Sequence, residues 1–335
     1  MNAQDFWQCA VKSADWLVSQ QAEDGRWKPI MQPVVDAYYK ASWALSLMGR
    51  PTAAHRSLDY AVRHLLQPNG DVQPRQHRWH SEVHYPYANA YFVMGGARLA
   101  RYDVASPALQ FLLTLSSPAS GAFAAVYTED NVPVRCDTMS TAAGGLACLA
   151  GGCLDGACRA ADWLQSLVER QPDPNRYFLC TVDAENALVT EFPEADAAWR
   201  VVRTDQPNQI WYAVGLPFAF LIKLAQATAR LEYLHLALWF LDFQQRCVNP
   251  WSGPSSGKAG WGCAELYRMT GEARYRDIAL SIGEYMAGFQ APDGSFQIPL
   301  SAPYDPQRPL APGDFDLTAE YTVWLGEIAA NLMVR

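Results

Sequence analysis

The sequence predicts an all-α fold in which six helical hairpins close into a ring. Apolar residues recur at helical spacing in twelve segments, each ended by Gly, Pro or Asn. Turn-rich loops follow every second segment, and five of the six contain glycine. From Gly25 to Gly294 they recur about every 54 residues, which suits one helix pair and its loops. Because a single hairpin cannot bury both of its faces, we expect an inner and an outer layer of six helices each.

The predicted helices follow one another along the whole chain. They cover residues 3–20, 37–49, 53–66, 88–100, 105–116, 138–151, 155–171, 207–227, 229–247, 258–269, 274–290 and 317–333. Period-two alternation is brief and confined to connections, as in 123–127 and 177–182, so we expect no convincing strand. Residues 1–335 are expected to form one domain.

Composition and charge exclude several classes of protein. Half of the 335 residues are hydrophobic and 18% are charged, which provides ample material for a core. The net charge of −8, without a basic stripe, makes nucleic acid an unexpected partner. The apolar stretch 211–222 is shorter than the roughly 20 residues of a membrane span. With no secretory signal at the N-terminus and no CxxC pair among eight cysteines, we expect a cytoplasmic protein with reduced core thiols.

One loop motif resembles a known family. Trp16, Gln21, Gly25 and Trp27 are spaced as in the QW repeat of squalene-hopene and related terpenoid cyclases, and residues 285–296 repeat the pattern with Phe for the last Trp. The resemblance implies the α/α-toroid fold, written (α/α)6. Physically, the Gln can bond freed backbone groups at a helix end, the Gly permits the chain to reverse, and the aromatic residue packs beneath. The motif is therefore interpreted as structural.

Titratable residues gather where the chain enters the predicted inner helices. They are Asp36, Lys40, His80, Glu82, His84, Arg135, Asp137, Arg203, Asp205, Lys258, Asp314, Asp316 and Glu320. The aromatic residues beside them are Tyr38, Tyr39, Tyr85, Tyr87, Trp211, Tyr212, Trp261 and Tyr321. In a ring these segments share one rim, so the sequence predicts acids and bases over an aromatic-lined pocket for a mainly hydrophobic molecule.

Four of these residues are candidates for proton transfer. Residues 314–319 read DFDLTA, which is similar to the DxDD motif of class II terpene cyclases and aligns Asp316 with their proton donor, although Leu317 replaces the last carboxylate. Asp137 and Asp36 are expected to share proton handling or to orient the substrate, and His84 to act as a base. The alternative is that Asp36, Asp137 and Asp316 are only N-caps, because each precedes a predicted helix.

The remaining candidates are expected to bind the substrate. Arg135 or Lys258 would bind a carboxylate or enolate of the substrate. Glu320 is also expected to contact the substrate. The residues expected to shape the pocket are Tyr39, Trp211, Tyr212, Trp261 and Tyr321.

No metal or other cofactor is expected. His80 and His84 are four residues apart with Glu82 between them, but Pro86 interrupts the helix that this spacing needs and no third ligand follows. The chain lacks a DDxxD motif for Mg²⁺, and no histidine follows His235 to complete the zinc site of a prenyltransferase β subunit.

The sequence therefore predicts a metal-independent enzyme, similar to terpenoid cyclases, that cyclises or isomerises a hydrophobic small molecule in natural-product biosynthesis. Acid–base catalysis or pericyclic preorganisation would suffice. Two alternatives remain open: a carbohydrate-active (α/α)6 enzyme, namely an epimerase, a lyase or an unsaturated-glycoside hydrolase, and a non-catalytic binding protein.

Overall fold

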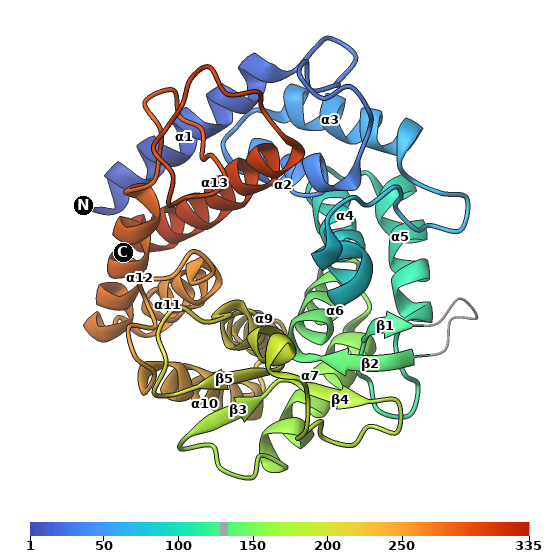
Figure 1. Cartoon of the computed structure of the whole chain (residues 1–335), viewed down its shortest axis with the longest axis vertical. Helices are drawn as coiled ribbons and strands as arrows, with labels where there is room; N and C mark the ends of the chain where they lie inside the picture. Colours follow the sequence, from blue (N-terminus) through green and yellow to red (C-terminus); the bar gives the residue numbers. More distant parts are fainter. Residues whose placement is uncertain (128–132, 335) are drawn as a thin grey trace.

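A computed structural model describes residues 1–127 and 133–334, apart from the side chains of residues 79, 80, 127 and 133. In this part of the chain, twelve main helices form two concentric layers, with the inner helices around the centre of the ring (Figure 1). The inner helices are α2 (Ala41–Leu47), α4 (Pro86–Arg98), α6 (Thr138–Ala150), α9 (Tyr212–Thr228), α11 (Gly257–Thr270) and α13 (Pro312–Met333). The outer helices are α1 (Ala3–Gln20), α3 (Pro51–His64), α5 (Tyr102–Thr114), α7 (Leu154–Glu169), α10 (Leu231–Gln245) and α12 (Ala273–Ala287). The predicted all-α toroid is confirmed.

The two layers follow from the composition of the helices. The inner helix α9 reads YAVGLPFAFLIKLAQAT and is buried on nearly all sides, whereas the outer helix α7 alternates a buried apolar stripe with exposed polar residues. Each inner helix packs against its two inner neighbours, and α13 closes the ring by packing against α2. The same helix α13 pairs with the outer helix α1, so the two ends of the chain share one hairpin. None of the helices in the described residues is long and apolar enough to cross a membrane.

The glutamine and glycine of the loop motif join neighbouring outer helices. The Gln21 side-chain amide donates to the carbonyl of Ala53 in α3 at 3.0 Å. We expected this amide to bond freed backbone groups at a helix end, but the bond instead joins the loop to the next outer helix. Gly25 has φ +93° and packs so closely on α3 that a Cβ atom would lie 2.0 Å from the Arg56 carbonyl oxygen. Residues 290–294 repeat both contacts against α1. The motif therefore fixes the spacing between successive hairpins.

The expectation that strands are absent was wrong. Strands β1 (Ala124–Tyr127), β2 (Pro133–Asp137) and β4 (Thr181–Asp183) form one antiparallel sheet, and β3 (Tyr177–Leu179) pairs with β5 (Val201–Arg203). All five lie in the long connections α5–α6 and α7–α9, where extended segments lie side by side and pair their backbone groups. The second connection also contains a short helix, α8 (Ala197–Arg200).

The predicted starts of two inner helices were also wrong. Helix α13 begins at Pro312, five residues before the predicted start, because proline suits the first helical turn and the Asp314 carboxylate accepts a bond from the Ala311 amide at 2.8 Å. Asp314 therefore caps this helix, and Asp316 lies inside it. Helix α9 begins at Tyr212, not at residue 207.

The glycine contacts can be tested by substitution with alanine. Gly25→Ala is expected to lower the free energy of unfolding by about 3 kcal/mol or more, because the new Cβ clashes with a helix carbonyl in addition to the unfavourable φ. Gly49 has φ +70° with no atom near its Cβ position, so Gly49→Ala should cost only about 1 kcal/mol. Urea denaturation measures both values. Equal losses would contradict the role given to the Gly25 contact.

Candidate active site

A cavity of about 420 Å³ opens at the mouth of the ring where the inner helices begin. Its walls come from the N-terminal ends of α4, α9, α11 and α13, from the turn before α2, and from loops above them. The lining residues are Asp36, Tyr39, Lys40, Gln76, His77, His84, Tyr87, Met139, Tyr212, Pro254, Ser255, Lys258, Ile298, Pro312, Gly313, Asp316, Leu317 and Glu320. Helix N-termini carry partial positive charge, so this mouth favours negative charge on a bound molecule.

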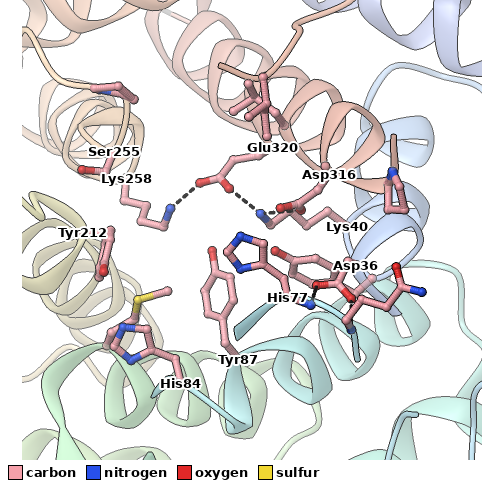
Figure 2. A pocket seen from close by; sticks show the side chains of 18 residues that line it. Asp36, Lys40, His77, His84, Tyr87, Tyr212, Ser255, Lys258, Asp316 and Glu320 are labelled. Atoms are coloured by element: carbon pink, nitrogen blue, oxygen red, sulfur yellow. Dashed lines mark hydrogen bonds and ion pairs between the residues drawn. The ribbon is translucent and has the colours of Figure 1, made fainter. Parts of the chain in front are cut away.

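One carboxylate joins two buried lysines at the centre of this cavity. Glu320 accepts hydrogen bonds from the ammonium groups of Lys40 and Lys258, and Lys40 also pairs with Asp316 at 2.8 Å (Figure 2). The lysine side chains are only 2% and 3% exposed. Burial would raise the pKa of Glu320, but the two lysines hold that pKa well below its ordinary value.

The two lysines differ in their electrostatic surroundings. Burial would lower the pKa of Lys40, but its two carboxylate partners, Asp316 and Glu320, outweigh burial and raise the pKa above its ordinary value. Among the described residues, Glu320 is the one carboxylate that forms an ion pair with Lys258, and burial together with repulsion from Lys40 lowers the pKa of Lys258. Lys258 is therefore the cation that gains more from a new negative partner in the cavity.

A second pair of ionisable side chains lies at the wall beside Tyr212. The Nδ1 atom of His84 lies 2.8 Å from Oδ2 of Asp137, and both side chains are buried. Burial would raise the pKa of Asp137, but His84 and Arg135 lower it below its ordinary value. Since an ionised carboxylate only accepts hydrogen bonds, the imidazole donates from Nδ1, and the tautomer that this bond selects has its lone pair on Nε2. This arrangement prepares His84 to accept a proton.

Asp137 also begins an inner helix, as the capping alternative predicts. Its Oδ1 atom accepts a hydrogen bond from the Ser140 amide at 2.7 Å at the start of α6, while Oδ2 faces His84. The other two acids are not N-caps. Asp36 lies in a 3-10 turn and accepts bonds from the amides of Gln76 and His77, which brings the loop that carries His77 over the cavity.

Three tryptophans form a floor one helical turn below the charges. Trp261 stacks on Trp324 with ring centroids 5.5 Å apart, and Trp43 meets Trp261 edge-on at 5.9 Å. The Trp324 indole donates to Glu320 at 3.0 Å, so the floor also holds the central carboxylate in place. We call Trp43, Trp261 and Trp324 the tryptophan layer.

The structure brings seven of the predicted site residues into the cavity wall: Asp36, Tyr39, His84, Tyr212, Lys258, Asp316 and Glu320. Asp137 lies behind His84, and Trp261 belongs to the tryptophan layer.

The remaining three predicted residues have structural contacts near the cavity. Arg135 donates to the Val83 carbonyl at 2.9 Å, Trp211 packs on Gly253, and the Tyr321 hydroxyl donates to the Pro254 carbonyl at 3.1 Å. They support the loops and turns around the cavity.

Three titratable residues of the lining, Lys40, His77 and Tyr87, had no assigned role at the sequence level. Lys40 and Tyr87 belong to the predicted rim, and the helix-start pattern could have identified them as partners of the acids. His77 lies in a loop with no motif, and the bonds from the amides of Gln76 and His77 to Asp36 help to bring it to the cavity. In Figure 2, Tyr87 and His77 extend toward the space below Glu320.

Among the residues that the structure describes, no three His, Cys, Asp or Glu side chains are grouped so that they could hold a metal ion. The side chain of His80, considered above as a ligand with His84, lies outside the described residues.

Comparison with known proteins identifies the fold. No protein-family model matches the chain, and no curated protein matches it. A D-mannose isomerase is similar over 98% of this chain and 97% of its own, with a TM-score of 0.69 and 12% identity. A GH76 α-mannanase of Bacteroides thetaiotaomicron covers 98% and 96%, with a TM-score of 0.66 and 14% identity. The type II terpene cyclase MstE of Scytonema covers 98% and 99%, with a TM-score of 0.58 and 12% identity.

These three proteins share the α/α toroid with this chain, as the motif resemblance implies. Their identities are low enough that the similarity establishes the fold alone.

The central carboxylate can be tested by its effect on stability. Glu320→Gln removes the charge that both buried lysines share, so the free energy of unfolding should fall by about 3 to 5 kcal/mol. Lys40 keeps its ion pair with Asp316 in this variant, whereas Lys258 loses its carboxylate, so the double variant Glu320→Gln/Lys258→Met removes the uncompensated charge and should recover part of that loss. Urea denaturation at pH 7 measures both. A double variant less stable than Glu320→Gln would contradict this account.

Proposed function

We propose that this chain is an enzyme that isomerises a small carbonyl compound by proton transfer. The observation that carries the proposal is the buried His84–Asp137 pair at the wall of the cavity that also holds Lys258 and Glu320. A base held in one tautomer and a cation in the same cavity are what enolisation requires. The reaction needs no second substrate, because the proton removed from one carbon is returned to its neighbour.

His84 is the base in this proposal. Its Nε2 atom takes the proton from the carbon next to the carbonyl group, and the Asp137 carboxylate stabilises the imidazolium that forms. The hydroxyl group on that neighbouring carbon passes its proton to the former carbonyl oxygen, and the imidazolium returns the first proton to the former carbonyl carbon. The carbonyl group has then moved by one carbon, and His84 is regenerated in each turnover. Asp137 acts as a positioning residue, and its second oxygen is fixed by the Ser140 amide.

Lys258 is the proposed partner of the developing enolate oxygen. Its ammonium group lines the cavity, and Glu320 is its one carboxylate partner among the described residues. The enolate provides a second negative partner as the proton leaves, so the stabilisation is greater in the transition state than in the bound substrate. Lys40, held by two carboxylates, supports Glu320 and not the substrate.

The walls of the cavity indicate an amphipathic substrate of modest size. Tyr39, Tyr87 and Tyr212 present ring faces with hydroxyl groups, while Met139 and Leu317 are apolar. Acids and bases on several sides favour a molecule with oxygen functions over a pure hydrocarbon. An aldose or ketose meets this description, and so does a hydroxylated aromatic or polyketide-like ketone. The similarity of the fold to a D-mannose isomerase makes sugars the first class to test.

A second candidate is proton-initiated cyclisation of a hydrophobic molecule with Asp316 as the acid. Asp316 lines the cavity next to Leu317 and near Ile298, and the fold is shared with a type II terpene cyclase. Its carboxylate pairs with Lys40 at 2.8 Å, so a proton donor at this position would have to give up that ion pair. The geometry therefore supports isomerisation better than cyclisation.

The base can be tested by isotope exchange. In D2O with a panel of aldoses, ketoses and hydroxylated aromatic ketones, the wild-type protein should isomerise at least one compound and introduce deuterium next to its carbonyl group. His84→Gln and Asp137→Asn should lower the rate by about 10²- to 10⁴-fold, because the first removes the base and the second replaces an acceptor by an amide that no longer fixes the tautomer. Nuclear magnetic resonance measures both the exchange and the product.

His235→Gln is the matched control, since His235 is an exposed residue of the outer helix α10. Full exchange in His84→Gln would overturn the assignment of the base. Specific binding of a panel compound without exchange or turnover would favour the non-catalytic alternative.

Asp316→Asn separates the two candidate reactions. If the enzyme isomerises its substrate, Asp316 only helps to hold Lys40, and the rate should change less than about tenfold while the free energy of unfolding falls by about 1 to 2 kcal/mol. Steady-state kinetics and urea denaturation measure the two effects. Loss of turnover by more than 10²-fold with unchanged stability would instead identify Asp316 as a general acid.

A further inference from the structure

A second cavity of about 420 Å³ lies on the other side of the tryptophan layer. It is formed mainly by the C-terminal halves of α4, α6 and α9, three neighbouring inner helices in Figure 1. The lining residues are Trp43, Met94, Ala97, Arg98, Leu146, Leu149, Ala150, Lys223, Ala227 and Trp261. Trp43 and Trp261 follow Lys40 and Lys258 by three residues, so one helical turn separates the walls of the two cavities.

The two cavities differ in their charge. The first is lined by carboxylates, lysines and histidines, whereas the ionisable residues that line the second are Arg98 and Lys223, both cations. Both are about one-third exposed. A ligand in the second cavity therefore meets two positive side chains and, among the described lining residues, no acid.

A purely structural role does not account fully for these cations. Arg98 pairs with Glu327 at 3.3 Å and Lys223 with Glu265 at 3.1 Å. Glu327 also accepts the Trp43 indole at 3.1 Å, and Glu265 accepts bonds from Gln226, Arg268 and Asn331. Both glutamates are thus satisfied by several donors. A guanidinium has five N–H groups and an ammonium three, so each cation can bind another acceptor.

The rest of the wall is apolar. Met94, Leu146 and Leu149 line it together with the faces of two tryptophans. The indole nitrogen of Trp261 is buried with no hydrogen-bond acceptor in the part of the chain that the structure describes, although the indoles of Trp43 and Trp324 each donate to a glutamate. Because that nitrogen is buried, the polar contacts that this cavity can offer to a ligand come from the two cations.

We propose that the second cavity binds a small amphipathic anion, with its apolar body against the tryptophan layer and its carboxylate between Arg98 and Lys223. The volume lies within the range of small-molecule sites, and the combination of an apolar wall with two cations at its rim matches an aliphatic or aromatic carboxylate. The proposal does not depend on the reaction in the first cavity.

Isothermal titration calorimetry with octanoate tests the site, and 1-octanol serves as the uncharged probe of the same length. The wild-type chain should bind one octanoate and bind 1-octanol at least tenfold more weakly. Arg98→Gln/Lys223→Gln should weaken octanoate binding by roughly tenfold or more and leave 1-octanol unchanged, because only the charged contacts are removed.

Two filling variants locate the site. Ala150→Trp and, from a different helix, Ala227→Trp place a large side chain on the wall of the second cavity at exposed positions, and both should abolish octanoate binding with unchanged helical circular dichroism. Leu317→Trp fills the first cavity and should leave octanoate binding intact. The proposal is overturned if octanoate does not bind, if binding survives in both filling variants, if Leu317→Trp abolishes it, or if 1-octanol binds as tightly as octanoate.

Discussion

The ion pairs of Glu320 tie together the helix that closes the ring and the site at its centre. Glu320 lies on α13, the last inner helix, and its partners Lys40 and Lys258 come from the two neighbours of that helix in the inner layer. A buried ion-pair network is not the most stabilising contact between three helices, since apolar side chains of similar volume stabilise a buried interface as well or better. Charges in this position therefore favour a chemical role, while the loop glycines and glutamines fix the spacing of the hairpins around them.

The inner helices divide the central space into layers by simple helical spacing. Lys40 precedes Trp43 by three residues, Lys258 precedes Trp261 by three, and Glu320 precedes Trp324 by four. Residues at these spacings lie above one another on the same face of a helix. Each of these three segments thus places a charge at the first cavity and an indole in the tryptophan layer. This layer separates the first cavity from the second, which has a similar volume and a different charge. A polar reaction and an apolar binding site can therefore share one ring.

The sequence predicted the helices well because their apolar periodicity is set by burial in two layers, as in α7 and α9. It did not predict the five strands, since their segments are short and depend on pairing between distant loops. Asp316 illustrates a further limit. Its position before a predicted helix suggested a helix cap or a proton donor. In the structure the helix begins earlier, at Pro312 with Asp314 as its cap, and the Asp316 carboxylate forms an ion pair with Lys40. His77 is brought to the cavity by backbone bonds to Asp36, and no local pattern encodes such a contact.

In the isomerisation proposed above, the balance of charge in the site determines where the new charges would form. Lys40 and Lys258 are matched by Glu320 and Asp316, so this network is neutral as a whole, and the Asp137 carboxylate faces His84. When a proton passes from a neutral substrate to His84, the cavity gains one positive and one negative charge together. The imidazolium forms against Asp137, and the enolate forms against Lys258, the less compensated of the two lysines. Each new charge thus meets an opposite charge that is already fixed in place, and little reorganisation is needed during the reaction.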